Sequence, residues 1–425
     1  MAMTTAERAA QIVERCRTLA AVTDVTAETT RTFLSPAMRR CNDMVAEWMR
    51  GAGMAVRVDA VGNLRGLLPV SDRRTRRLVI ASHLDTVPNA GAFDGVLGVM
   101  LGLAVVEAMQ DASLPFAVEV IGFSEEEGVR FSAPFVGSRG FAGTLDETLL
   151  SRVDADGVSV RDAMRAYGLK ADNFDDARFV AETFAYLELH IEQGPLLESL
   201  EQPLGVVDAI VGQSRFEVAF EGEANHAGTT PMHLRHDALA AAAEWINTVE
   251  AYAAHPNRVI ATVGKMNVSP GAVNVIVGEV HTTLDLRSAD DHSRQVAAEN
   301  LIRAAEESGQ RRGVRVKSTL HMEQGAVAMD TRLTTELTEA VRTCGVEPVR
   351  MISGAGHDAM IVAPYIPATM LFLRSPRGLS HHPDEAVIVE DVRLALESGV
   401  ALLRRLAQTD AMGRNDGAKT DAAAR

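Results

Sequence analysis

The chain is poor in cysteine, in positive charge and in long apolar runs. Its three cysteines, Cys16, Cys41 and Cys344, form no CxxC pair, which indicates reduced thiols in a cytoplasmic protein rather than a disulfide framework. Lys and Arg number 42 against 57 Asp and Glu, a net charge of −15. This balance argues against nucleic acid or an anionic membrane surface as a partner, although one local arginine can still bind a small anion.

Aromatic content is low, at 4%, and no apolar stretch is long enough to cross a membrane. The longest run follows Asp94 and is broken by Glu107, well short of the roughly 20 residues that a spanning helix needs. The first residues carry charges where a signal peptide would need an apolar centre. We therefore expect a cytoplasmic protein with neither a membrane nor a nucleic-acid partner.

What the chain does have is an alternation of apolar strands and helical patterns, which predicts an α/β domain with a mixed sheet. Its 425 residues allow two or three domains. Near Val211 the pattern changes to strands with one solvated face. We expect a smaller α+β domain, two helices on an antiparallel sheet, inserted at 212–328 into a larger domain of residues 1–211 and 329–408. The polar residues 409–425 are expected to be a disordered tail.

Metal-type ligands follow several of the predicted strands. His83 ends the strand after Arg77, the run Glu125–Glu127 follows the apolar strand 117–123, and His190 ends the strand 186–190. Asp94 lies at the start of a predicted helix, and His381 lies in a turn after the strand 368–374. Such ends meet at one edge of an α/β sheet, where ligands bind.

Each of these residues has an ordinary explanation when taken alone. Asp94 could be a helix cap, the glutamates a solvated loop, and either strand-end histidine a satisfied polar group. Together on one sheet edge they predict a metal centre, and imidazole with carboxylate suits Zn, Mn, Co or Ni better than Ca or Mg. One carboxylate that bridges two ions would let the remaining ligands complete a pair of sites.

Two further roles follow from position. Asp85 can accept the free N–H of His83 and fix the tautomer of that ring. Of two adjacent glutamates after a strand, one can bind metal while its neighbour acts as general base toward a water. Spacing alone does not say which glutamate does which.

The chain resembles the bimetal amidohydrolases of the M20 metallopeptidase clan. Within the clan it is similar to the branch that contains N-carbamoyl-L-amino acid hydrolase, allantoate amidohydrolase and β-ureidopropionase. The resemblance runs from about residue 40 to about residue 400 and rests on the segments SHLDTVPNAGAFDGVLGV, EEEGVRF, LELHIEQGP, ANHAGTTPM, NVIVGEVHTTLDLR, SGAGHDAM and GLSHHPDEA. HIEQGP, NHAGTTPM and GAGHDA separate this branch from the peptidases of the clan.

The resemblance implies a role for each matched residue. It makes Glu126 the general base, and it gives Glu125 and His382 no direct part in the site. Two divalent ions are implied, Zn or Mn, with Co or Ni as alternatives, and their ligands would be His83, Asp94 (bridging), Glu127, His190 and His381.

The resemblance also implies the substrate contacts. His226 would reach the site of a partner subunit and stabilise an oxyanion, which implies a homodimer. Asn274 and Arg287 would hold the substrate carboxylate, for which an arginine fork is well suited. Gln193 would lie near the ureido group, and His357 would be a further substrate-site residue. Because Asn274 and Arg287 fall in the inserted domain, closure of that domain over the substrate is expected.

The activity implied is hydrolysis of a ureido C–N bond. Allantoate is favoured as substrate, because Leu373–Pro376 looks more like the bacterial allantoate amidohydrolases than like the carbamoylases. N-carbamoyl-L-amino acids and the β-ureidopropionase substrate are the alternatives. A dipeptidase or aminoacylase of the same clan is a more distant one. A catalytically dead scaffold is the most distant, since it predicts a missing ligand or base and none is missing.

Overall fold

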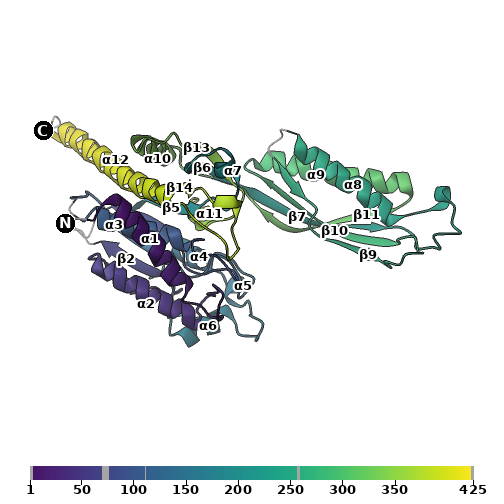
Figure 1. The fold of residues 1–425 in the computed structure, drawn as a ribbon, viewed down its shortest axis with the longest axis horizontal. Helices are drawn as coiled ribbons and strands as arrows, with labels where there is room; N and C mark the ends of the chain where they lie inside the picture. Colours follow the sequence, from purple (N-terminus) through teal and green to yellow (C-terminus); the bar gives the residue numbers. More distant parts are fainter. Residues whose placement is uncertain (1–2, 69–75, 111, 256–258, 423–425) are drawn as a thin grey trace. The chain divides into compact units, whose positions relative to one another are not determined.

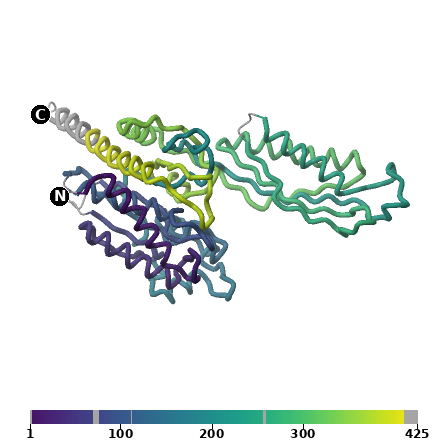
Figure 2. Tube along the Cα trace, in the orientation of Figure 1, coloured from purple at the N-terminus to yellow at the C-terminus, as the bar shows by residue number. Residues whose placement is uncertain are grey.

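The structure is a computed structural model that describes residues 3–68, 76–110, 112–255 and 259–422, with side chains as far as residue 409. The chain divides into two compact units: unit 1 is Met1–Asp208 with Met329–Arg425, and unit 2 is Ala209–Ala328 (Figure 1). Figure 2 shows that unit 1 uses the purple-to-blue and the green-to-yellow parts of the trace. The insertion predicted from the sequence, 212–328, begins three residues later than unit 2 and ends at the same residue.

Four parallel strands form the centre of the larger sheet. They are β4 (Ala117–Phe123), β3 (Arg77–His83), β5 (Thr183–Ile191) and β14 (Ala368–Leu373), side by side in that order. On either side, β2 (Leu64–Leu68) pairs with β4 and β6 (Leu204–Ile210) pairs with β14, both antiparallel. The remaining strands are β1 (Ala55–Val58), β12 (Val327–Ala328) and β13 (Val349–Ser353). The prediction of an α/β fold with a mixed sheet is therefore confirmed.

Helix α3 (Val96–Ala108) forms the middle of the unit 1 core. It is apolar on every side and buried from Val96 to Val106, as expected for a helix enclosed by other elements. It packs on β3 and β5 and against α1 (Thr5–Ala20) and α12 (Val389–Ala422). The core thus lies directly behind the strand ends that carry the predicted ligands.

The other helices of unit 1 begin at recognisable caps or are short connectors. Helix α2 starts with Ser35 as N-cap and a proline in its first turn, both favoured there. The remaining elements are α2 (Pro36–Gly51), α4 (Val136–Ala142), α5 (Glu147–Leu150), α6 (Val160–Tyr167), α7 (Leu196–Ser199), α10 (Thr331–Thr343), α11 (Asp358–Val362) and the 3₁₀ turn η2 (Pro376–Gly378).

Unit 2 is an antiparallel sheet with two helices on one face. Strands run in the order β11-β7-β10-β8, and β9 also pairs with β10. Apolar residues of β7 and β10 alternate inward and form a core with α8 and α9, in which Trp245 is fully buried. The elements are β7 (Gly212–Glu221), η1 (Met232–Leu234), α8 (Ala238–Ala254), β8 (Ile260–Thr262), β9 (Met266–Ser269), β10 (Glu279–Ser288), α9 (Asp291–Arg312) and β11 (Arg315–Gln324).

One sequence expectation differs from the structure. Helix α12 continues to Ala422, whereas a disordered tail is expected from residue 409. The segment has several alanines and no proline, so a helix that has already begun can continue despite two glycines. Gly62-Asn63, which the sequence pattern of residues 56–68 indicates as a hairpin turn, does lie in the five-residue connection between the antiparallel strands β1 and β2. Across the described ranges, no helix combines the length and the apolar character that crossing a bilayer requires.

Candidate metal centre

The predicted ligands of unit 1 converge at one edge of its sheet. His83 is the last residue of β3, His190 lies at the end of β5, and the glutamates follow β4. Asp94 precedes α3, and His381 follows η2 after β14. Because β3, β4, β5 and β14 are parallel neighbours, their carboxyl ends meet here, as the sequence predicts.

Asp94 lies between two sets of ligand atoms. Its Oδ1 is 3.2 Å from Nε2 of His190 and 3.8 Å from Nε2 of His83. Its Oδ2 is 3.2 Å from Nε2 of His381, which in turn is 3.5 Å from Oε1 of Glu127. The structure therefore brings all five predicted ligands together, in two groups that share one carboxylate.

The two buried histidines are oriented by backbone carbonyls. Nδ1 of His83 lies 3.0 Å from the carbonyl oxygen of Asp85, and Nδ1 of His190 lies 2.9 Å from that of Ile191. A carbonyl can only accept, so each ring donates its Nδ1–H, and in the neutral ring the lone pair of Nε2 is left for the site. Both rings present the atom that a metal ion would bind.

Glycine 95 makes this approach possible. A Cβ at Gly95 would lie 2.4 Å from atoms of the His83 ring, and the residue has φ +67°, in the left-handed region. Only glycine meets both conditions without strain. The Asp-Gly pair thus sets the bridging carboxylate against His83.

Asp85 accepts the N–H of His83, as expected, but mainly through its backbone carbonyl, and it has a second role. Its carboxylate accepts the backbone N–H groups of Glu126, at 3.0 and 3.1 Å, and of Glu127, at 3.1 Å. The Oδ1 atom is 3.5 Å from Nδ1 of His83, beyond the closer carbonyl. Asp85 therefore orients the two glutamates first and the histidine second. The sequence could not show this, because the contact joins two strand ends about 40 residues apart.

The glutamates that follow β4 differ in what surrounds their carboxylates. Glu126 is 8% exposed, and its carboxylate lies within 4.8 Å of ligand atoms of both His83 and Glu127. Glu125 is only 1% exposed, which excludes for it the solvated loop considered for the glutamates. His382 is exposed and its Nδ1 accepts the N–H of Asp384 within the turn.

Negative charge is in excess at the centre. Burial disfavours the charged ring of His83, but the hydrogen bond with Asp85 and the charge of Glu126 outweigh it and raise the pKa of His83. Burial also raises the pKa of Glu126, and burial with nearby carboxylates raises the pKa of Glu127 to about 7. Burial would raise the pKa of Asp94, but its close contacts with the rings of His190 and His381 outweigh burial and hold that pKa well below its usual value.

These atoms fit a metal ion. Nε2 of His83 and Nε2 of His190 are 3.5 Å apart, and both face the buried Oδ1 of Asp94, which has no hydrogen-bond partner among the described residues. Three acceptors that converge in this way attract a cation, whether a proton or a metal. Two imidazoles with a carboxylate are a donor set typical of Zn, Mn or Co.

Two of the predicted substrate residues also lie at this centre. Nε2 of Gln193 donates to Oδ2 of Asp94 at 3.0 Å. His357 is 1% exposed, with its ring 4.6 Å from that of His190 and its Nε2 3.0 Å from Oγ of Ser353. Burial holds the pKa of His357 well below its usual value, so the ring is neutral.

The other three predicted residues belong to unit 2. His226 is exposed, and its Nδ1 accepts the N–H groups of Gly228 and Thr229 at 3.0 and 3.2 Å. The neutral ring therefore carries its proton on Nε2, as an outward donor. Asn274 pairs through its carbonyl with Ala227. Nε of Arg287 donates to Oδ1 of Asp285 at 2.9 Å.

Sequence reasoning missed several residues that support the centre. Ser380 donates to Oδ2 of Asp94 at 2.9 Å. The carboxylate of Glu188 accepts the N–H of Ala359 at 2.7 Å. Glu188 is two residues before His190 on the same strand face, which was the one available signal. Arg31 and Glu385 act through contacts with backbone groups. Glu385 falls in the segment GLSHHPDEA, but nothing in the sequence indicates the partner of either side chain.

Comparisons with known proteins find relatives in one family of hydrolases. The model of "Peptidase family M20/M25/M40" matches residues 79–409. A "Probable allantoate deiminase" of Oryza sativa subsp. japonica is 36% identical over 94% of this chain and 88% of its own length. An "N-carbamoyl-L-amino acid amidohydrolase" of Geobacillus stearothermophilus is 38% identical over 89% of this chain and 93% of its own. A solved hydantoinase/carbamoylase family amidase from Burkholderia ambifaria has a TM-score of 0.87 and 33% identity, covering 93% of this chain and 97% of that one.

Proposed function

This chain belongs to peptidase family M20/M25/M40, and we propose that it is a dinuclear-metal amidohydrolase that cleaves the ureido C–N bond of a small carboxylate, with allantoate as favoured substrate. The observation that carries the proposal is the shared carboxylate of Asp94, with two histidines facing one oxygen and His381 with Glu127 facing the other. Relatives named for allantoate and for N-carbamoyl amino acids, each over most of this chain, support the reaction class.

Two divalent ions, Zn or Mn with Co or Ni as alternatives, would be held at this centre. His83 and His190 with Oδ1 of Asp94 would hold one, and Oδ2 of Asp94 with Glu127 and His381 the other. When bound, such ions act as Lewis acids toward a carbonyl and lower the pKa of water. With a metal ion bound in place of a proton, all five side chains would be carboxylates or neutral imidazoles that present lone pairs to the centre.

Glu126 would be the general base. Its carboxylate borders the ligand cluster without belonging to the Asp94 groups, and Asp85 holds its backbone. It would take a proton from the attacking water and then give that proton to the leaving nitrogen, so that one side chain serves both halves of the reaction.

The substrate would be held by residues of both units. Arg287, oriented by Asp285, and Asn274 would bind the carboxylate, and Gln193 and His357 would face the ureido group. His226 presents an N–H at Nε2, which suits it to stabilise the oxyanion that forms during attack.

We propose that unit 2 serves as lid and dimerisation domain, so that His226 acts in the partner's site. Three large apolar side chains near His226 support an interface: Met232 is 77% exposed, Leu234 59% and Val273 fully exposed. Exposed apolar groups that gather in one region mark interaction sites more often than free surface. Closure of unit 2 over a bound carboxylate would then bring the substrate contacts to the metals.

The choice of allantoate rests on Leu373–Pro376. Arg374 pairs with Asp391 through two bonds of 2.9 Å, so this arginine has a structural partner. Ser375 accepts the N–H of Gln193 through its Oγ at 3.2 Å. The segment would therefore act on specificity by positioning Gln193 rather than by touching the substrate.

A substrate panel with metal analysis tests the proposal. Protein stripped with a chelator is reloaded with Mn²⁺, Zn²⁺ or Co²⁺, and ammonia release is measured with allantoate, N-carbamoyl-L-methionine, N-carbamoyl-β-alanine and a dipeptide. We expect metal-dependent turnover of allantoate above the others. Turnover of the carbamoyl amino acid alone would move the substrate to that alternative, and cleavage of the dipeptide alone would reject ureido hydrolysis. The cytoplasmic location expected from cysteine usage stays a prediction.

A further inference from the structure

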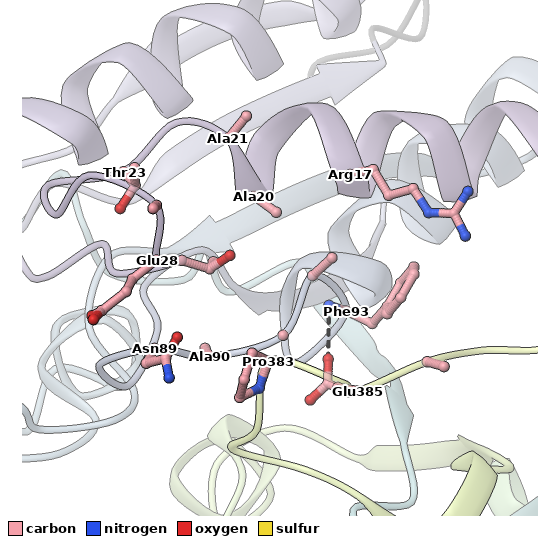
Figure 3. Close-up of a pocket in the computed structure, with 15 residues that line it drawn as sticks. Arg17, Ala20, Ala21, Thr23, Glu28, Asn89, Ala90, Phe93, Pro383 and Glu385 are labelled. Carbon is pink, nitrogen blue, oxygen red and sulfur yellow. Dashed lines mark hydrogen bonds between the residues drawn. The ribbon is translucent and has the colours of Figure 1, made fainter.

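A single carboxylate connects the turn that carries His381 with the loop that carries Asp94. Glu385 lies four residues after His381, and its Oε1 accepts the N–H groups of Phe93 at 2.8 Å and of Asp94 at 2.9 Å. Glu385 is 6% exposed, and Figure 3 shows it beneath Phe93 with the first of these bonds dashed. It belongs to none of the groups of ligand atoms found among the described residues.

Gly91 leaves the room that this contact needs. A Cβ at Gly91 would lie 2.3 Å from Cβ of Glu385 and 2.7 Å from its Oε1, and all three nearest atoms belong to Glu385. The φ of Gly91 is not in the left-handed region. Space for Glu385, rather than backbone conformation, is therefore the reason for a glycine here.

Glu385 has no competing anchor. Its Oε2 is buried and has no hydrogen-bond partner among the described residues. The residue lines a cavity of about 640 Å³ together with Arg17, Thr29 and Asn89 (Figure 3). Ordered water can occupy polar space of this size. Among the described residues, the two N–H groups of the Asp94 loop are thus the only groups that hold the carboxylate.

We propose that Glu385 is a positioning residue that sets the bridging carboxylate of Asp94 relative to His381. The inference rests on the proposed function, because it concerns the ion that these two ligands would share. His381 needs such support: it is the most exposed of the five ligands, with 47% of its side chain exposed and φ +54°. Ser380 and Glu385 both bind the Asp94 segment, from either side of His381 in the chain.

Metal binding, measured without substrate, tests the inference. The apoprotein is titrated with Co²⁺ alone, and calorimetry and the visible spectrum report the Kd and coordination of each ion. We expect Glu385→Ala to weaken one of the two ions by about 10- to 100-fold, the range for residues that orient ligands. Glu385→Gln keeps an oxygen that accepts both N–H groups, so it should restore binding to within a few-fold. Asp384→Asn, at the exposed neighbour, is the matched control.

A second variant moves Glu385 without changing it. Gly91→Ala should push the carboxylate off the two N–H groups and weaken the same ion. The double variant Gly91→Ala/Glu385→Ala should be no weaker than Glu385→Ala, because both changes break one contact. Gly51→Ala, whose Cβ meets no atom within 4 Å, controls for the substitution. Should Glu385→Ala fail to fold, Gly91→Ala and Glu385→Gln carry the test.

Two results would overturn the inference. One is wild-type affinity for both ions in Glu385→Ala or in Gly91→Ala. The other is a loss in Glu385→Gln as large as in Glu385→Ala, which would make charge rather than hydrogen bonding the cause. The metal titration uses no ureido compound, so its result does not depend on turnover. Absence of turnover on allantoate would reject the proposed function, and the metal affinities would still test the inference.

Discussion

At the scale of single residues, the centre depends on imidazole and carboxylate atoms that converge and so attract a cation. His83 and His190 donate through Nδ1 to backbone carbonyls, so their Nε2 atoms turn toward Asp94. Asp85 holds the backbone of the two glutamates that follow β4. The chemistry of each ligand is thus set by a neighbour, and the roles of the residues can be separated by substitution.

Replacing the general base should stop turnover and leave the metals in place. Glu126→Gln removes a proton acceptor, so we expect kcat to fall by about 10²- to 10⁴-fold with unchanged metal content. Kinetics with metal analysis measure both. Glu125→Gln, one residue away and also buried, is the control and should keep most activity. Near-normal turnover by Glu126→Gln would assign the proton transfer elsewhere.

Replacing the carboxylate anchor should act mainly on substrate binding. Arg287→Ala removes charge-assisted hydrogen bonds worth about 1.5–3 kcal/mol, which corresponds to a rise in KM of roughly 10- to 100-fold. Steady-state kinetics test this. Arg215 also pairs with Asp285 and is half exposed, so Arg215→Ala is a matched control. Equal kinetics in the two variants would contradict the assignment of Arg287.

At the scale of elements, a buried arginine joins the end of α1 to the segment that follows β3. The side chain of Arg31 is fully buried, and it donates to the carbonyls of Leu84, Leu19 and Val22 at 2.7, 2.9 and 3.0 Å. Its backbone N–H and carbonyl also pair with Thr86. Leu84 lies between His83 and Asp85, so this contact fixes the strand end from which the centre is built.

Removing that arginine should destabilise unit 1. Arg31→Met removes a donor from three carbonyls: those of Leu84 and Val22 lose the Arg31 side chain as donor, whereas that of Leu19 keeps the N–H of Val22. At about 1–3 kcal/mol for each unsatisfied group, we expect a loss of several kcal/mol or no folded protein. Denaturant unfolding measures it. Arg40 also donates to a backbone carbonyl but is exposed, so Arg40→Met should change stability by under about 0.5 kcal/mol. A neutral Arg31→Met would refute the joining role.

At the scale of the whole molecule, the proposed reaction needs residues from both units and from a second subunit. His226, Asn274 and Arg287 lie in unit 2, and the ligands and Glu126 lie in unit 1. A homodimer in which His226 serves the partner's site makes a prediction that no single-chain enzyme shares.

Mixing two inactive variants should restore activity. Glu126→Gln and His226→Asn protomers each lack one group. In a mixed dimer, one site combines the intact Glu126 of one protomer with the intact His226 of its partner. Random assortment then gives about a quarter of wild-type activity, measured after the two proteins exchange subunits. No recovery in dimers shown by light scattering to be mixed would place His226 in its own subunit's site or outside catalysis.

The sequence by itself determined the architecture and the ligand set of this protein. The apolar run 117–123 predicts a buried strand, and the apolar segment after Asp94 predicts a core helix. Both predictions hold because a segment that is apolar on every side is stable only when it is buried. Ligand-type residues at strand ends then follow from the topology of parallel strands. Spacing alone did not say which glutamate is the general base. The prediction of Glu126 as base and Glu127 as ligand came from the family motifs.

Only the tertiary structure decided how those ligands are held. Asp85 meets the glutamates across neighbouring strands, Arg31 meets Leu84 across 53 positions, and Glu385 meets Asp94 across 291. These contacts use backbone N–H and carbonyl groups, which all residue types except proline carry alike. A sequence therefore cannot mark them, whereas it marks ligands and cores through the chemistry of their side chains.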